Sequence, residues 1–168
     1  PFEVKIAPRA KTVELVARAT GGGHLLLDDV TVYETGKTID GPIPVPIRNP
    51  GFQGMRPDPD SWVVSDGAWS HNGELQYYAP DRAVIRDGAM VITADQRAVG
   101  DRKMSAAHVS TAGRHELKYG RWAIRAKLPT SEGMWPAIWL LPEDGSWPPE
   151  IDIIELVGKE PNRVHCSF

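Results

Sequence analysis

The sequence is poor in the residues that build several common kinds of site. Cys166 is its single cysteine, so no intrachain disulfide can form and no cysteine-based zinc spacing exists. No apolar run is long enough to span a bilayer. These absences exclude a disulfide-stapled domain and a helical membrane anchor within this stretch of chain.

An excess of positive charge is also missing. The formal net charge is -3, with 19 Lys and Arg against 22 Asp and Glu, and the basic residues are scattered. No basic stripe is available to neutralise phosphates, so we do not expect nucleic acid as a partner. An anionic membrane surface is disfavoured for the same reason. Hydrophobic residues make up 41%, which is enough for a packed core.

Long stretches with helical periodicity are absent, and short apolar runs between turn residues take their place. Asp87-Gly88 separates the β-prone runs 83–86 and 89–94, which is typical of a hairpin with a type I′ turn. Further strands are expected at 121–128, 134–141 and 150–157. The pattern predicts an all-β sandwich of antiparallel strands.

The first part of the chain reads as two strands followed by a linker. Residues 12–18 alternate apolar and polar side chains, and 25–33 form a second strand-like run. Two strands cannot bury a core alone, so we expect residues 1–35 to be a fragment of a separate β-sandwich. Residues 36–50, rich in Pro and Gly, are predicted to be a linker, with a second unit over 51–168. Few contacts are expected across this boundary.

Three acids are concentrated in the run Glu150-Ile151-Asp152-Ile153-Ile154-Glu155. On a regular strand Glu150 and Asp152 share one face, while Glu155 lies on the other. One extra residue near Ile153, in a β-bulge, would bring the three acids onto one face and turn the isoleucines mostly inward. We therefore predict a bulge at this point of the strand.

Two glutamates in such a row suit the retaining hydrolysis of glycosides. That reaction needs two carboxyls about 5–5.5 Å apart, and side chains leaning together could span the roughly 13 Å between the two Glu Cα atoms. Asp152 would favour protonation of a neighbouring carboxyl by repulsion, or share a proton with Glu150. Two other interpretations stay open: a site for a hard cation, and a solvated acidic face without a role.

Four segments, in order, resemble glycoside hydrolase family 16: Asn72–Tyr78, Gly120–Pro129, Gly133–Pro142 and Trp147–Glu155. The likeness is closest to the laminarinase-type endo-β-1,3-glucanases. It implies a jelly-roll β-sandwich with a concave cleft, of which 51–168 would be the incomplete, N-terminal part. It also implies Glu150 as the nucleophile, Glu155 as the acid/base and Asp152 as the assisting carboxylate.

The resemblance further implies a set of substrate-binding residues: Trp135, Trp139, Trp147, Arg125, Arg121, Asn72 and Glu74. For each Trp the alternative is packing in the core, and for Arg125 it is a surface ion pair. Residues 1–35 look like the last strands of a carbohydrate-binding module. No cofactor or metal is implied as required, and a structural calcium is compatible with the sequence but not indicated by it.

The expected function is therefore hydrolysis of β-1,3-glucan or mixed-linkage β-glucan by a secreted or extracellular monomer, although no signal peptide is visible. The expected partner is the polysaccharide. Two alternatives remain. One is a hydrolase of a marine galactan, as in agarases and carrageenases. The other is a non-catalytic β-glucan-binding protein on the same fold, and such proteins usually lack the two glutamates that this sequence retains.

Overall fold

The computed structural model describes residues 12–19, 23–33, 52–116 and 121–168, with the side chains of 52–116, 122 and 124–168 among them. Thirteen strands and two short 3₁₀ turns, η1 (His71–Gly73) and η2 (Pro80–Arg82), make up this part. It contains no α-helix, and neither turn is long and apolar enough to cross a membrane. The predicted all-β class is confirmed.

The strands form two large sheets and one small sheet. The six-stranded sheet has the order β13 (Val164–Ser167), β12 (Ile151–Leu156), β11 (Met134–Leu141), β1 (Thr12–Ala19), β9 (His108–Ser110) and β3 (Val63–Val64). The four-stranded sheet has the order β10 (Arg121–Lys127), β2 (Gly23–Tyr33), β7 (Ala89–Ala94) and β6 (Ala83–Arg86). The small sheet has the order β4 (Gly67–Ala68), β5 (Gln76–Tyr78) and β8 (Met104–Ala106).

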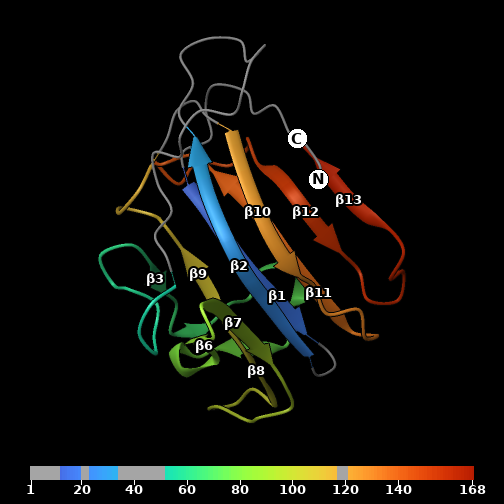
Figure 1. The fold of residues 1–168 in the computed structure, drawn as a ribbon. Helices are drawn as coiled ribbons and strands as arrows, with labels where there is room; N and C mark the ends of the chain where they lie inside the picture. Colours follow the sequence, from blue (N-terminus) through green and yellow to red (C-terminus); the bar gives the residue numbers. More distant parts are fainter. Residues whose placement is uncertain (1–11, 20–22, 34–51, 117–120) are drawn as a thin grey trace.

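The two large sheets pack face to face around the main hydrophobic core, and Figure 1 shows β2 and β10 in front of β1 and β11. The four-stranded sheet contributes Ile85, Met90 and Ile92 to this core. The six-stranded sheet contributes Val109, Ile138, Leu140 and Ile151. Side chains that interdigitate between two facing sheets define a β-sandwich, and this one matches the expected jelly-roll architecture.

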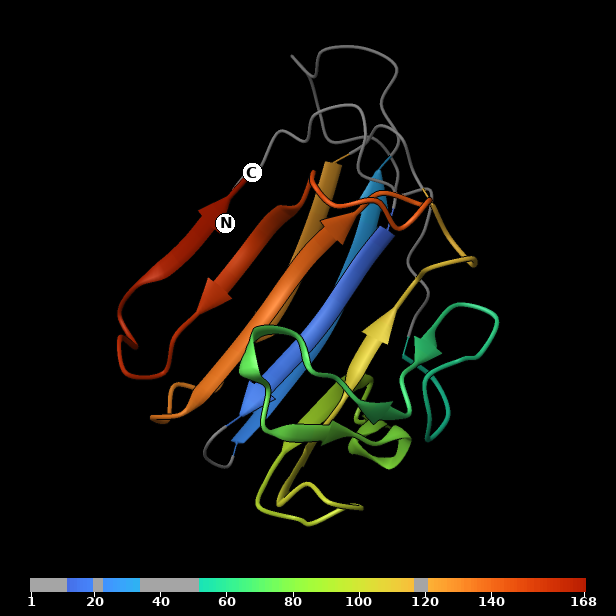
Figure 2. The ribbon, with the colours of Figure 1, turned by 180° about the vertical axis from the view of Figure 1, so that it is seen from behind.

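A second cluster covers part of the outer face of the six-stranded sheet. Met134, Ala137 and Trp139 of β11 pack there with Tyr78 and Met104, which belong to the small sheet. Figure 2 shows the small sheet, in green, lying across this face, with β12 and β13, in red, to one side. The outer face is therefore covered at one end and leaves the region of β12 and β13 exposed beside it.

The β6–β7 hairpin agrees with its sequence prediction. Arg86 pairs with Ala89, so the loop consists of Asp87 and Gly88 alone. Both loop residues have positive φ, 52° and 75°, as a type I′ turn requires.

The first two strands differ from the sequence prediction. β1 pairs with β11 from Thr12 to Ala19 and with β9 on its other side, while β2 lies between β10 and β7. The prediction of few contacts across the boundary is wrong for these strands. An alternating pattern predicts that a strand forms but not which sheet supplies its hydrogen-bonding partners. The linker at 36–50 lies outside the described residues, and the assignment of 1–35 to a binding module stays a prediction.

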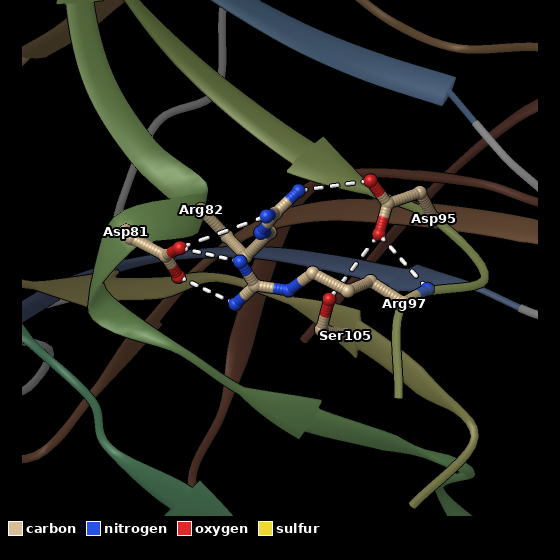
Figure 3. Close-up of polar contacts among 5 residues, drawn as sticks. All are labelled: Asp81, Arg82, Asp95, Arg97 and Ser105. Carbon is tan, nitrogen blue, oxygen red and sulfur yellow. Dashed lines mark hydrogen bonds and ion pairs between the residues drawn. The ribbon is translucent and has the colours of Figure 1, made fainter. Parts of the chain in front are cut away.

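A network of ion pairs holds η2 to the end of β7 and to β8 (Figure 3). Both guanidinium nitrogens of Arg97 reach the carboxylate of Asp81, at 2.5 and 2.7 Å. Arg82 donates to Asp95 at 2.8 Å, and the hydroxyl of Ser105 donates to the same carboxylate at 3.2 Å. The Arg97 guanidinium lowers the pKa of Asp81 by its hydrogen bonds and charge. The network therefore fixes β8, the strand on which the small sheet is built.

The lowered pKa of Asp81 predicts a pH-dependent contribution to stability. A carboxyl with a lower pKa in the folded state stabilises the fold above its unfolded pKa, and this contribution is lost as the pH falls through the folded pKa. Asp81→Asn should thus lower the melting temperature at neutral pH by a few degrees at most, because the pair is half exposed. The loss should shrink toward about pH 3.

Thermal unfolding by circular dichroism across this pH range measures the effect. Asp60→Asn is the control, since Asp60 is exposed and has no ion pair in the described part of the chain. A deficit of Asp81→Asn that stays constant with pH would contradict the assignment.

Gly158 marks a close contact between the turn after β12 and the turn before β11. Its N–H donates to the carbonyl of Met134 at 2.8 Å, and a Cβ at Gly158 would lie 1.9 Å from the carbonyl oxygen of Ser131. Backbone cannot give way as the end of a flexible side chain can, so a methyl group here forces the two turns apart.

We expect Gly158→Ala to lower the free energy of unfolding by about 1–3 kcal/mol. The matched control is Gly145→Ala, where φ is 71° but the added Cβ meets nothing within 4 Å. It should cost only the strain of the positive φ. Urea unfolding of the two variants compares them, and equal losses would show that the contact with Ser131 is unimportant.

Candidate functional site

The strand β12 contains one more residue than its neighbours at the predicted position. Ile154 pairs with Ile138 of β11, and Asp152 pairs with Trp139, so Ile153 has no partner on β11. The pairing of β12 with β13 is interrupted in the same interval, between Asp152 and Glu155. The bulge predicted near Ile153 is therefore confirmed on both sides of the strand.

The bulge places the acids on one face of the sheet. Asp152 lies opposite Trp139 and Glu155 opposite Ala137, and these two residues of β11 are two apart, so they share a face. Glu150, two residues before Asp152, continues the same row by alternation. We call Glu150, Asp152 and Glu155 the carboxylate row.

The isoleucines of the same segment turn to the sandwich interior. Ile151 is 6% exposed and belongs to the main core, and Ile153 and Ile154 pack against that core although they are only partly buried. The predicted division, acids outward and isoleucines mostly inward, is confirmed.

Each member of the carboxylate row accepts a hydrogen bond from a different element. Glu150 Oε2 accepts from the indole N–H of Trp147 at 2.8 Å. Glu155 Oε1 accepts from the indole N–H of Trp135 at 3.1 Å. Asp152 Oδ2 accepts from the hydroxyl of Ser167 at 2.5 Å. These donors come from the loop before β12, from β11 and from β13, so the row is held from both sides.

The three predicted cleft tryptophans differ in exposure. Trp147 is 72% exposed and Trp135 is 38% exposed, whereas Trp139 is only 8% exposed. The prediction that at least two are accessible beside the row is confirmed. The indole N–H of Trp139 is buried and has no hydrogen-bond partner among the described residues.

A cleft of about 380 Å³ opens next to Trp139. It is lined by Ala68, Trp69, Ser70, His71, Trp139 and Leu141. Trp139 pairs with Asp152 in the sheet, so the cleft borders the carboxylate row. Its volume lies in the range of small-ligand sites, and two of its lining residues are tryptophans, a residue type that can stack on a sugar ring.

Aromatic packing around a buried histidine supports this wall. The His108 ring is 4% exposed, and its centroid lies 4.5 Å from that of Trp69 and 6.4 Å from that of Trp139. Its Nδ1 lies 2.7 Å from the hydroxyl of Ser65, which fixes the ring. The two indoles that line the cleft therefore rest on a common, oriented support.

The structure places Asn72 and Glu74 differently. Asn72 is exposed in η1 and directly follows His71 of the cleft wall. Glu74 is 7% exposed, and its Oε2 accepts hydrogen bonds from Gln76 at 3.2 Å and from the hydroxyl of Tyr78 at 2.9 Å. These contacts hold the carboxylate of Glu74 in the interior, and its role in substrate binding stays a prediction.

Arg125 of β10 is not brought to the carboxylate row. β10 belongs to the four-stranded sheet, and Trp122 and Ile124, which flank position 123, pack against the main core. Arg125 alternates with them and is exposed on the other side of that sheet, away from the row. Arg125 is thus away from the row, and its role in substrate binding stays a prediction; the side chain of Arg121 lies outside the described residues.

Sequence reasoning missed several residues of this region. Ser167 and His165 lie opposite Asp152 and Glu155 on β13, and Trp69 and His71 line the cleft. A hairpin across the turn that follows Leu156 would have paired Ser167 and His165 with the acidic strand. Trp69 and His71 could have been found from their position just before Asn72. No group of three or more His, Cys, Asp or Glu side chains in the described part of the chain is arranged to hold a metal ion.

Comparison with known proteins agrees with the geometry. Residues 72–168 match the model of the glycosyl hydrolases family 16. The chain belongs to this family. The match contains the whole carboxylate row and, of the cleft wall, Trp139 and Leu141. The resemblance found from the four sequence segments is thereby confirmed.

Relatives of this family 16 chain include several with named activities. It is 40% identical over 121 residues to the beta-glucanase of Rhodothermus marinus, covering 65% of this chain and 42% of the relative. It is 35% identical over 119 residues to the endo-1,3-1,4-beta-glycanase ExsH of Rhizobium meliloti, covering 61% and 26%. It is 36% identical over 125 residues to the glucan endo-1,3-beta-glucosidase A1 of Niallia circulans, covering 64% and 17%. The matches thus span less than half the length of these relatives.

Proposed function

We propose that the full-length protein is a retaining endo-glycosidase that hydrolyses β-1,3-glucan of the laminarin type or mixed-linkage β-glucan. The observation that carries the proposal is the bulge in β12, which sets Glu150, Asp152 and Glu155 in one row beside an aromatic cleft. The names of the three relatives described above, a beta-glucanase, an endo-1,3-1,4-beta-glycanase and a glucan endo-1,3-beta-glucosidase, support the substrate class.

The proposed reaction proceeds in two displacements. Glu150 attacks the anomeric carbon while Glu155 protonates the leaving oxygen, and Glu155 then takes a proton from the water that releases the sugar. Glu150 must start ionised, and the hydrogen bond from Trp147 favours that state. Once Glu150 and Asp152 are charged, their repulsion favours retention of the proton on Glu155.

The charge of the site favours a neutral polysaccharide over a sulfated one. The six described residues that line the cleft include neither Lys nor Arg, and the adjoining row is acidic. A sulfated galactan brings negative charge that such a surface repels. A neutral glucan needs only stacking faces and hydrogen-bonding edges, which the tryptophans supply.

We also propose that the protein works outside the cell, since a polymeric glucan is not taken up intact. The proposed steps need only side chains of the chain itself, so neither a cofactor nor calcium is part of the reaction. Detection of the full-length protein in the medium of its source cells tests the location. As a control, a cytoplasmic marker protein should be absent from the same medium, which shows that the cells have not lysed.

Digestion of laminarin, lichenan and agarose by the full-length protein tests the substrate class. We expect internal cleavage of laminarin or lichenan into a ladder of oligosaccharides, and no cleavage of agarose. Proton NMR during the reaction should show the β anomer first, because two displacements retain configuration. Cleavage of agarose alone would reject the glucan proposal, and initial release of the α anomer would reject the retaining mechanism.

Variants of the two glutamates test their separate roles. Glu155→Ala should lower kcat on a glucan by about 10²- to 10⁴-fold, because general acid–base assistance is lost. With an activated substrate, azide should restore turnover of this variant and give the β-azide, since the covalent intermediate still forms.

Glu150→Gln should abolish formation of the glycosyl-enzyme, and rescue of Glu150→Ala by azide should give the α-azide by direct attack. NMR of the azide products distinguishes the two anomers, and circular dichroism checks that each variant is folded. Products of the reverse stereochemistry would mean that the roles of the two glutamates are exchanged.

A further inference from the structure

Two partly exposed indole rings donate to the two glutamates of the carboxylate row. Trp147 stands three residues before Glu150 and reaches its Oε2 at 2.8 Å. Trp135 stands on β11, twenty residues before Glu155, and reaches its Oε1 at 3.1 Å. With 72% and 38% of their surface exposed, these rings are not placed there by burial in a core.

The chemistry of an indole N–H suits a carboxyl that must change its charge. The group donates and never accepts, it does not titrate, and it carries no net charge. A Lys or Arg in its place would stabilise the ionised state far more strongly and would hinder protonation of an acid catalyst. An indole N–H thus orients a carboxylate and changes its proton affinity less than a cation would.

The geometry of the bulged strand makes such orientation necessary. The Cα atoms of Glu150 and Glu155 lie at the ends of a five-residue interval, whereas two displacements need carboxyls about 5–5.5 Å apart. Each glutamate side chain has three torsions, and freezing them costs conformational entropy. Donors supported at separate points of the fold keep both side chains in one arrangement before the substrate arrives.

We propose that Trp147 and Trp135 are positioning residues, whose indole N–H groups hold the nucleophile Glu150 and the acid/base Glu155 at their working separation. The inference rests on the proposed function for the roles of the two glutamates. The inference goes beyond the proposed function, because it assigns to these two tryptophans the orientation of the catalytic carboxyls, a role separate from stacking on a sugar.

Replacement of each tryptophan by phenylalanine separates the two tasks, since phenylalanine keeps a flat apolar face and loses the donor. Trp147→Phe should lower kcat roughly 10- to 100-fold on every substrate, because nucleophilic attack is impaired whatever the leaving group. Trp135→Phe should lower kcat on a glucan by a similar factor. It should affect an aryl glycoside with a good leaving group much less, because that substrate needs little acid assistance. KM should change little in either variant.

Trp122→Phe is the matched control. Trp122 packs against the main core from the four-stranded sheet and does not adjoin the row, so its kcat and KM should equal those of the wild type. Wild-type kcat in Trp135→Phe and Trp147→Phe would overturn the inference. So would an increase in KM without loss of kcat, which is the signature of stacking alone.

A second measurement does not depend on activity. In the full-length protein labelled with ¹⁵N-tryptophan, the indole N–H signals of Trp135 and Trp147 should shift as the bonded glutamates titrate. The response of Trp135 should be lost in Glu155→Gln and that of Trp147 in Glu150→Gln. Signals indifferent to these substitutions would overturn the inference. A wild type inactive on all glucans, with the NMR responses intact, would instead reject the proposed function and leave the contacts established.

Discussion

The extra residue in β12 is the constraint on which the rest of the site depends. Without Ile153, Glu155 would point between the two large sheets, into a core that contains Ile138, Leu140 and Ile151. A carboxylate buried there without a partner is prohibitively costly, and Ile154 would be turned out to water. The bulge lies between Asp152 and Glu155 and shifts the alternation of side chains by one residue. Glu155 therefore joins the other two acids on the outer face, and Ile154 faces the core.

The neighbouring strand β11 is what converts this row into a site. Its regular alternation sends Ile138 and Leu140 into the sandwich and Ala137 and Trp139 to the outer face. Trp139 pairs with Asp152 and also lines the cleft, so the acids border a cleft that contains two tryptophans. β11 therefore links the carboxylate row to one wall of the cleft through a single regular strand, which favours precise placement.

Local features of this chain could be predicted from the sequence, whereas pairing over long distances could not. The bulge follows from acids and isoleucines that fit no regular alternation, and the Asp87-Gly88 turn follows from the positive φ that both residues tolerate. The places of β1 and β2 in the sheets, the burial of Glu74 and the outward position of Arg125 depend on which strands pair and which face meets the core. Periodicity predicts which side chains of a strand share a face, but it does not predict which strands pair with it.

Electrostatics explains why neutral donors are suited to this row. Three carboxylates share one strand face, and each of them accepts a hydrogen bond from a neutral group. The donors from Trp135, Trp147 and Ser167 stabilise the carboxylate oxygen atoms by their dipoles without adding a positive charge. The double displacement proposed above needs one ionised and one protonated glutamate, and a neutral donor can orient a carboxyl without adding a charge beside it.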